Sequence, residues 1–415
     1  MIIDENLLNY KEYEFILGKK ELESLYINTP ISKNLSEAFV DKAIEYINLR
    51  LINYEEKNSS EFDAWLSYLI NYQNLLLDKV STLIDDKTID EEKLKNLIKD
   101  FIYRGKSKSE VSLGLVLCGD YLEDYEIDHI VKVFSKSGDY IFYLTDCIKN
   151  IEDYEEFLFD LCKKAEGTIK VFALMNMDFS KEEEVKYLIN EGYKNNEYID
   201  LIIKHIMESN FIWEYLKKDD LSFKDIKSIS YIVSNYIRDK DVEDLPCIMN
   251  LINLYLPYAI IGGSDIYSIY AIYLMETVIS HKKLEFLKDR EFLLNIIKDK
   301  LKRCEYLFRT ALKKAQGDVT DIIELGEYYK YKFSFKELKP YLKTVKNGYF
   351  IYYYFQNSSS LLEKEDCKRY FIENPKFKEI LEYFDDLENY NKASGEGDFI
   401  VKFDSALKRR NSIGS

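Results

Sequence analysis

The sequence predicts an all-α fold, built as an α-solenoid in which helical hairpins stack one upon the next. Apolar residues recur at helical spacing in nearly every segment, and no segment alternates apolar and polar residues as a half-buried strand would. Between Glu126 and Ser209, three helical pairs follow one another, with Gly138, Gly167 and Gly192 at or near their joints. Such a spacing of helical pairs is typical of repeat proteins of the HEAT and armadillo kind.

The apolar spacing within these pairs predicts that each helix buries one stripe. The first helix has apolar residues at the offsets i, i+3, i+4 and i+7, namely Ile127, Ile130, Val131 and Phe134. The last helix repeats the same offsets with Ile199, Ile202, Ile203 and Ile206. On this register we expect four residues of the repeats to belong to the core: Leu161, Leu174, Leu188 and Ile202.

The ends of these helices also have sequence signals. Asp153 with Glu156, and Ser180 with Glu183, have the spacing at which an N-cap side chain and the third helical residue satisfy each other's free amides. The joint glycines are expected to supply the left-handed residue that ends a helix.

Helical spacing continues on both sides of the repeats. The N-terminal part is predicted to form helices over 36–53, 62–70, 88–104 and 109–122, and the C-terminal part over 211–217, 224–237, 292–301, 304–314 and 320–331. The aromatic run GYFIYYYFQ, from Gly348 to Gln356, predicts a buried helix or short strand, with a partner-facing aromatic ridge as the alternative. The segment KASGEGDF is predicted to be a loop, and the end KRRNSIGS a terminal tail.

The chain of 415 residues exceeds the usual length of one hydrophobic core, yet no linker rich in Pro, Gly or Ser divides it. A continuous helical array reconciles these two facts. We therefore expect an N-terminal helical region at 1–105, HEAT-like repeats at 106–240, and a C-terminal helical region at 241–415 that continues the array.

The charge of the chain argues against nucleic acid as a partner. Lys and Arg number 58 against 74 Asp and Glu, a formal net charge of -16. Binding to a phosphate backbone depends on clustered cations, and the basic residues cluster only at Lys408, Arg409 and Arg410. A basic or apolar polypeptide is the expected guest of such an acidic array.

Six dispersed cysteines without a CxxC motif indicate reduced thiols of a cytoplasmic protein. The N-terminus MIIDENLLNYKEYEF is acidic and does not have the pattern of a signal peptide. Both observations favour the cytoplasm.

An uncharged stretch runs from Leu245 to Ser264, and the uncharged character resumes after Asp265 as far as Met275. Its length could suit a membrane span. Its prolines, asparagines and paired glycines instead favour two buried helices broken near Pro257 or the glycine pair, Gly262 and Gly263. The same stretch, 245–275, could line an apolar pocket.

No motif predicts a catalytic residue, a metal or a cofactor. Glu126 and His129 have the ExxH spacing of di-iron carboxylate bundles, but such a site needs a second ExxH and two more glutamates. Neither His205 nor His281 has a glutamate three residues before it. The phosphate-binding, dinucleotide-binding, zinc-protease and serine-hydrolase motifs are also missing from the sequence.

The stretch from Phe157 to Ser209 resembles an uncharacterised HEAT-like repeat family of low-GC Gram-positive bacteria, some of whose members are labelled limonene hydroxylase. The resemblance rests on Gly167 and Lys170 at the ends of a turn, and on Gly192 and Asn195 after the following helix. Thr168 and Ile169 replace the family's usual Trp and Gly within the turn. Hydroxylation of an unactivated carbon requires haem, iron, copper or a flavin, and the sequence has no motif for any of them, so we do not extend that activity to this chain.

The sequence thus favours a non-enzymatic scaffold that binds a protein or peptide on the concave side of the array. The alternative is an enzyme or carrier that holds a small apolar ligand in 245–275. The second helix of each pair usually lines the concave side, which makes Lys170, Asn176 and Lys204 the candidate partner-binding residues.

Overall fold

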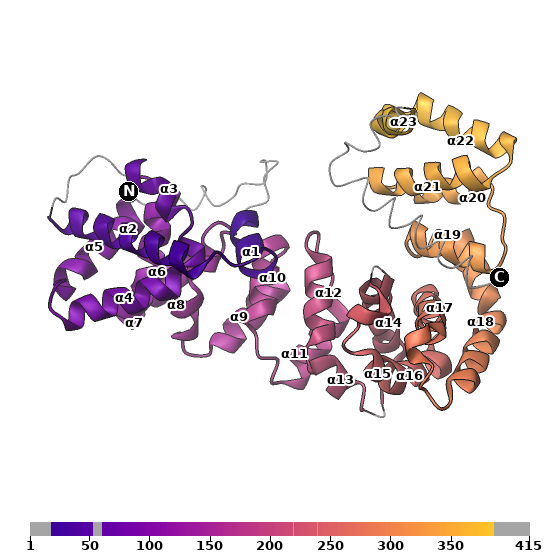
Figure 1. The fold of residues 1–415 in the computed structure, drawn as a ribbon, viewed down its shortest axis with the longest axis horizontal. Coiled ribbons are helices and arrows are strands. Elements are labelled where there is room, and N and C mark those ends of the chain that lie inside the picture. The colour runs from indigo at the N-terminus through magenta and orange to yellow at the C-terminus, as the bar shows by residue number, and fades with distance from the viewer. Residues whose placement is uncertain (1–17, 53–59, 219, 239, 386–415) are drawn as a thin grey trace. The chain divides into compact units, whose positions relative to one another are not determined.

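The computed structural model describes residues 18–52, 60–218, 220–238 and 240–385, and all the regular structure in these ranges is helical (Figure 1). The prediction of an all-α chain is thereby confirmed. The sequence-predicted loop KASGEGDF and the tail KRRNSIGS lie outside the described residues.

The chain divides into two compact units, Met1–Ile202 and Ile203–Ser415. The three regions expected from the sequence, 1–105, 106–240 and 241–415, stay predictions. Within the first unit the helices are α1 Lys19–Tyr26, α2 Lys33–Ile52, α3 Ser60–Leu66, η2 Leu69–Asn71, α4 Gln73–Asp85, α5 Glu91–Arg104, α6 Lys108–Tyr121, α7 Asp124–Phe134, η3 Ile141–Tyr143, α8 Thr145–Lys149, α9 Tyr154–Lys164, α10 Gly167–Asn176, α11 Glu182–Tyr187 and the π-turn η4 Leu188–Gly192.

Helix α12, Ile199–Glu208, spans the division between the units. The helices that follow it are α13 Phe211–Tyr215, α14 Phe223–Arg238, η5 Val242–Asp244, α15 Ile248–Asn250, the π-turn η6 Leu251–Tyr255, α16 Leu256–Gly262, α17 Ile266–Ser280, η7 Lys282–Leu284, α18 Arg290–Lys313, α19 Val319–Tyr328, α20 Phe335–Leu338, η8 Lys339–Tyr341, α21 Val345–Ser358, α22 Leu361–Glu373, η9 Pro375–Phe377 and α23 Lys378–Asp385.

Helix α6 is the centre of the first unit's core, and it packs along α5. Its uncharged segment is buried, as the sequence predicts. Gly114 lets the two helices approach closely, because a Cβ at this position would lie 2.8 Å from Ile102 Cγ1 and 2.9 Å from Phe101 Cβ. The apolar stripe of α7, from Ile127 to Phe134, is buried as well.

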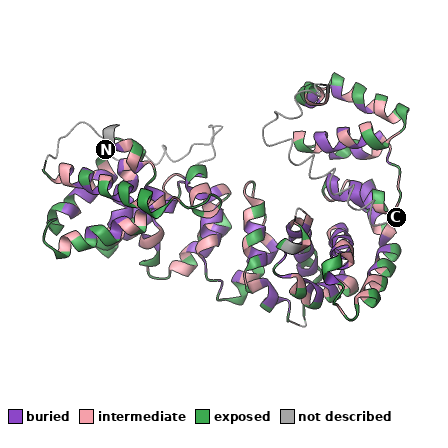
Figure 2. Ribbon diagram, in the orientation of Figure 1, coloured by how far each residue is buried: buried purple, intermediate pink, exposed green. Residues whose placement is uncertain are grey.

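Helix α17 has the corresponding place in the second unit, where it packs against α14 and α18 (Figure 2). It is buried on nearly all sides, which explains why Glu276 is its single charged residue. The break before it lies at Gly263 to Asp265, where the Asp265 carboxylate caps α17 by accepting from the amide of Tyr267 at 2.9 Å. Pro257 does not break the chain. Helix α15, the π-turn η6 and α16 follow one another without a gap, and the π-turn that ends two residues before Pro257 is a place where a helix interior tolerates a missing N–H.

No helix among the described residues is both long enough and apolar enough to cross a bilayer. The aromatic run from Gly348 to Gln356 lies within α21 and is largely buried, as the core interpretation predicts. The six cysteines are free and buried.

The joint glycines do not have the helix-ending, left-handed conformation that the sequence predicts. Only Gly167 is left-handed, with φ 66°, and it begins α10 rather than ending α9. Gly192 ends the π-turn η4 at an ordinary φ, with its Cα packed close to Leu188 and Leu174. The small size of this glycine, rather than its conformational freedom, suits the joint.

The helix boundaries also differ in places. Asp153 precedes α9 but makes no capping bond, and the cap predicted for Ser180 lies one residue later, where the Lys181 amide donates to Glu184 at 3.1 Å. The segments 292–301 and 304–314 form one continuous helix, α18, because Lys302 and Arg303 between them favour helix.

Candidate functional site

A groove on the first unit lies between the end of α7 and the outer face of α9, and we name it the α7–α9 groove. Its volume is about 620 Å³. It is lined by Lys132, Ser135, Lys136, Phe157, Asp160, Leu161, Lys164, Ala165, Glu166 and Ile169.

The floor of the α7–α9 groove is apolar. Four residues spaced four apart form it: Phe157, Leu161, Ala165 and Ile169. All four are half-buried. The adjacent stripe of α9, about 100° round the helix, includes Leu158 and Cys162 and is fully buried in the core. Helix α9 therefore has two apolar stripes, and only one of them is covered by the unit itself.

Leu161 accordingly departs from its predicted place in the core. Leu174, Leu188 and Ile202 are buried with no exposed surface, as expected, whereas Leu161 faces the groove. The reason is geometric, since Leu161 lies one position before the buried Cys162 and is turned about 100° round the helix from it. The prediction was right for three of the four residues and wrong for Leu161.

The rim of the groove is charged and rich in lysine. Lys132 pairs with Asp128 at 2.5 Å, and Lys164 pairs with Asp160 at 2.6 Å. The hydrogen bond from Lys164 lowers the pKa of the Asp160 carboxyl. In each pair the two side chains are exposed and come from positions one helical turn apart. Each pair therefore contributes little to stability, and its lysine exchanges easily to another partner. Lys136 is exposed beside them.

The floor is held by a hydrogen-bonded joint at the start of α10. The Asn195 side chain accepts from the Gly167 amide at 2.8 Å and donates to the Gly167 carbonyl at 3.1 Å. The Lys170 ammonium donates to the carbonyls of Glu191 at 3.2 Å and Lys194 at 2.7 Å. The Glu191 carbonyl also accepts from the Lys194 amide at 3.1 Å, so the ammonium ties together two carbonyls at and just after the end of the π-turn.

The joint brings together the positions on which the family resemblance rests, namely Gly167, Lys170, Gly192 and Asn195. It also changes the role of Lys170 from the one predicted. The side chain is 6 % exposed, and burial lowers the pKa of its ammonium. A buried ammonium that already donates to two carbonyls supports the fold, so Lys170 does not lie on an open partner-binding surface.

The other two candidate residues lie elsewhere. Asn176 borders a smaller hollow of about 200 Å³ between α8, α9 and α10, and its amide donates to the Tyr26 hydroxyl at 3.2 Å and the Phe172 carbonyl at 2.8 Å. Lys204 is an exposed residue of α12, in the second unit. The structure therefore does not gather Lys170, Asn176 and Lys204 on one described surface, and their partner-binding role stays a prediction.

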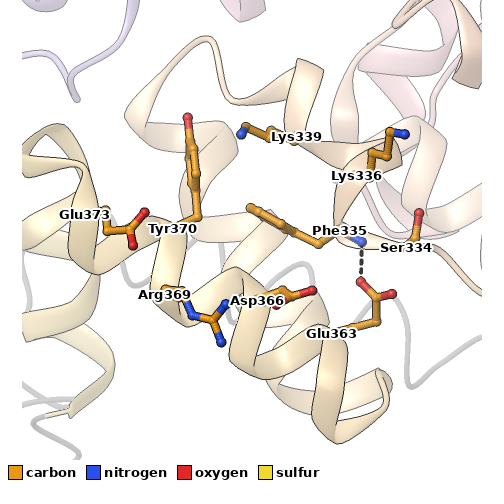
Figure 3. A pocket seen from close by; sticks show the side chains of 9 residues that line it. All are labelled: Ser334, Phe335, Lys336, Lys339, Glu363, Asp366, Arg369, Tyr370 and Glu373. Carbon is orange, nitrogen blue, oxygen red and sulfur yellow. Dashed lines mark hydrogen bonds and ion pairs between the residues drawn. The ribbon is translucent and has the colours of Figure 1, made fainter.

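A second groove, the α20–α22 groove, lies within the second unit and holds about 330 Å³ (Figure 3). Its lining is mostly charged. It consists of Ser334, Phe335, Lys336, Lys339, Glu363, Asp366, Arg369, Tyr370 and Glu373.

Several polar groups of the α20–α22 groove bind one another. Glu363 accepts from the backbone amide of Phe335 at 2.5 Å and thus caps α20 from α22 (Figure 3). The Lys339 ammonium lies 4.3 Å from the centre of the Tyr370 ring. Arg369 and Asp366 form an exposed ion pair at 3.7 Å. This groove offers a guest few unsatisfied groups and little apolar surface.

The described residues contain no group of three or more His, Cys, Asp and Glu arranged to hold a metal ion. Glu126, of the ExxH pair, instead forms an ion pair with Lys99 at 2.8 Å. The arrangement at the α7–α9 groove suits binding, since it combines apolar floor and charged rim without an activated nucleophile or base.

Sequence reasoning missed Phe157, Ile169 and Lys136 as site residues. One signal was available for Phe157. The apolar and aromatic residues of α9 lie at 154, 157, 158, 159, 161 and 162, a stripe wider than one core contact requires. Lys136 carries no such signal, because its place at the rim depends on how α7 packs.

Comparison of the chain with protein-family models, with curated proteins and with solved structures finds no match. Any functional conclusion therefore rests on the grooves themselves.

Proposed function

We propose that this chain is a non-enzymatic scaffold of the α-solenoid type that binds a polypeptide segment in the α7–α9 groove. The observation that carries the proposal is the half-buried apolar floor formed by Phe157, Leu161, Ala165 and Ile169. An apolar floor under a charged rim is the usual anatomy of a surface that a partner covers. Helices that are neighbours in the chain also pack together, as α5 with α6 and α9 with α10 do, which supports a solenoid of hairpins.

The spacing of the floor favours a helical guest. The part of the floor on α9, from Phe157 to Ala165, extends about 12 Å at the helical rise. Successive apolar side chains lie one turn apart, so an amphipathic helix with anchors at i, i+4 and i+7 can interdigitate with them. Each well-buried anchor contributes about 1.5–3 kcal/mol of apolar transfer free energy.

The charge of the rim refines the expected guest. The net charge of the whole chain favours a basic or apolar segment, but charges more than about 8 Å away are largely screened at physiological salt. At the groove, Lys132, Lys136 and Lys164 outnumber Asp160 and Glu166. We therefore propose an apolar helix flanked by acidic residues, which the lysines can engage.

The small-ligand alternative has less support. Within 245–275, residues 266–275 belong to α17, whose side chains pack against α14 and α18, and this packing accounts for the apolar character of that part. We keep the HEAT-like family and the cytoplasm as proposals. The buried free cysteines suit a reducing compartment.

A displayed library of 16-residue amphipathic peptides tests the proposal. The library is selected on the intact protein and counter-selected on the Leu161→Asp variant. We expect the selected peptides to share apolar residues at i and i+4 with acidic neighbours. Peptides that bind parent and variant equally, or a selection that yields no binder, would contradict the proposal.

A further inference from the structure

We propose that Cys118 and Cys147 form a modification site, at which a small peroxide converts the two thiols to an intramolecular disulfide between α6 and α8. The two Sγ atoms lie 3.0 Å apart. Both thiols also lie near the Leu115 carbonyl, at 3.2 Å for Cys118 and 3.5 Å for Cys147. Among the described residues, this is the one pair of cysteines whose sulfur atoms are in contact.

The backbones on both sides permit the bond. A disulfide requires the sulfur atoms to move from 3.0 Å to about 2.05 Å, a contraction of only about 1 Å. Gly119 brings α6 close to the start of α8, because a Cβ there would lie 3.2 Å from Cys147 Sγ and 3.3 Å from its backbone nitrogen. The helices are therefore near enough for the bond without separation or rotation of the core.

The reaction balances with hydrogen peroxide as the oxidant. One thiolate attacks a peroxide oxygen, the O–O bond breaks, and hydroxide leaves a sulfenic acid behind. The second thiol then attacks the sulfenic sulfur, the S–S bond forms, and the S–O bond breaks to release water. Each sulfur is oxidised by one electron, the peroxide is reduced to two waters, and both thiol protons end in those waters.

The environment makes this reaction slow at neutral pH. Both side chains are almost completely buried. The neighbouring Cys147 thiol, and then burial, raise the pKa of the Cys118 thiol well above its usual range. Because the thiolate is the nucleophile, oxidation should accelerate as the pH rises. Peroxide is small enough to enter during a local opening of the helices.

The consequence is a covalent ring of residues 118–147 that contains all of α7. A ring of about 30 residues restricts the unfolded chain and raises the melting temperature of a unit of this size by roughly 5 °C or more. Helix α7 carries Lys132 at the rim of the α7–α9 groove, but the disulfide can form whether or not that groove binds a guest.

The test is peptide mapping of the full chain after graded exposure to hydrogen peroxide at pH 8, with free thiols blocked before digestion. Trypsin should release the peptides 109–132 and 137–149 joined by a bond that a thiol reductant breaks, and the melting temperature should rise and fall with that bond. Cys147→Ser should abolish the linked species, while Cys162→Ser, a change at another buried cysteine, should retain it. Oxidation that yields only sulfinic acids, or linkage of other cysteines, would overturn the proposal. The mapping of the parent chain decides the question even if a variant fails to fold.

Discussion

The α7–α9 and α20–α22 grooves are both lined by residues of more than one helix, yet they differ in what covers their side chains. In the α20–α22 groove, Glu363 caps α20 and Lys339 lies over Tyr370, so several of its polar groups have partners within the unit. In the α7–α9 groove, Leu161 and its apolar neighbours remain half-exposed to water. A hollow with internally paired charges needs no guest, whereas an uncovered apolar stripe gains free energy when one arrives.

The comparison also teaches that volume and charge are poor guides to function in this chain. Charged side chains are abundant everywhere, and most exposed ion pairs contribute little. Apolar side chains that the unit leaves uncovered in a row are the more selective signal. The predictions below separate residues that support the fold from residues that would hold a guest.

The largest effect is expected beneath the groove. Leu174→Ala removes a fully buried side chain and should lower the free energy of unfolding by about 2–5 kcal/mol, measured by urea denaturation. Leu161→Ala should cost clearly less, because Leu161 is half-exposed. If the two variants unfold alike, the distinction between core and groove on this helix pair is wrong.

A smaller loss of stability is expected in the α20–α22 groove. Glu363→Ala removes the acceptor for the Phe335 amide and should destabilise the second unit by about 1–3 kcal/mol. Its matched control is Glu365→Ala, an exposed position of the same helix, which should unfold like the parent. Neither change should alter binding of a selected peptide, and a loss of affinity in Glu363→Ala would show that this groove also takes part.

A modest effect on binding is expected at the rim. Lys136→Glu should weaken a selected acidic peptide by roughly 3–10-fold at low salt, and the difference should shrink as salt rises. Lys204→Glu changes an equally exposed lysine of the second unit and should leave the affinity unchanged. Titrations at two salt concentrations measure both. An effect of Lys204→Glu as large as that of Lys136→Glu would support the prediction that Lys204 is a partner-binding residue.

No effect is expected with nucleic acid. With a net charge of -16, the purified chain should not shift DNA or RNA in a gel assay at physiological salt. Tight binding there would overturn the assignment of a polypeptide guest.

The helical class could be predicted from the sequence because the buried face of an amphipathic helix follows from the local spacing of its apolar residues. The stripe from Ile127 to Phe134 is an example, since its spacing and its burial agree. Helix ends were less predictable. The helix-favouring Lys302 and Arg303 were a local signal for the continuous α18, whereas the shift of the cap to Lys181 has no such signal.

The candidate site was predictable only in part, because the deciding contacts join distant segments. Lysine is usually a surface residue, and the burial of Lys170 is explained only by its hydrogen bonds to the carbonyls of Glu191 and Lys194. The contact of Cys118 with Cys147 has no local signal, because it depends on how α6 meets α8. Leu161 has the same apolar spacing as the core residues. Only the position of α7 leaves its side chain half-exposed.

The most direct test of the proposed binding groove is isothermal titration of one selected peptide into the parent, Leu161→Asp and Leu362→Asp. Leu161 is in the floor of the α7–α9 groove, while Leu362 is an exposed leucine of α22 that is 66 % accessible. The two variants carry the same chemical change. Leu161→Asp should weaken binding by about 100-fold or more while still unfolding cooperatively, because on binding an apolar contact is lost and a carboxylate is desolvated. Leu362→Asp should bind like the parent. Equal affinity for all three proteins, or an equal loss in both variants, would contradict the assignment of the α7–α9 groove as the binding site.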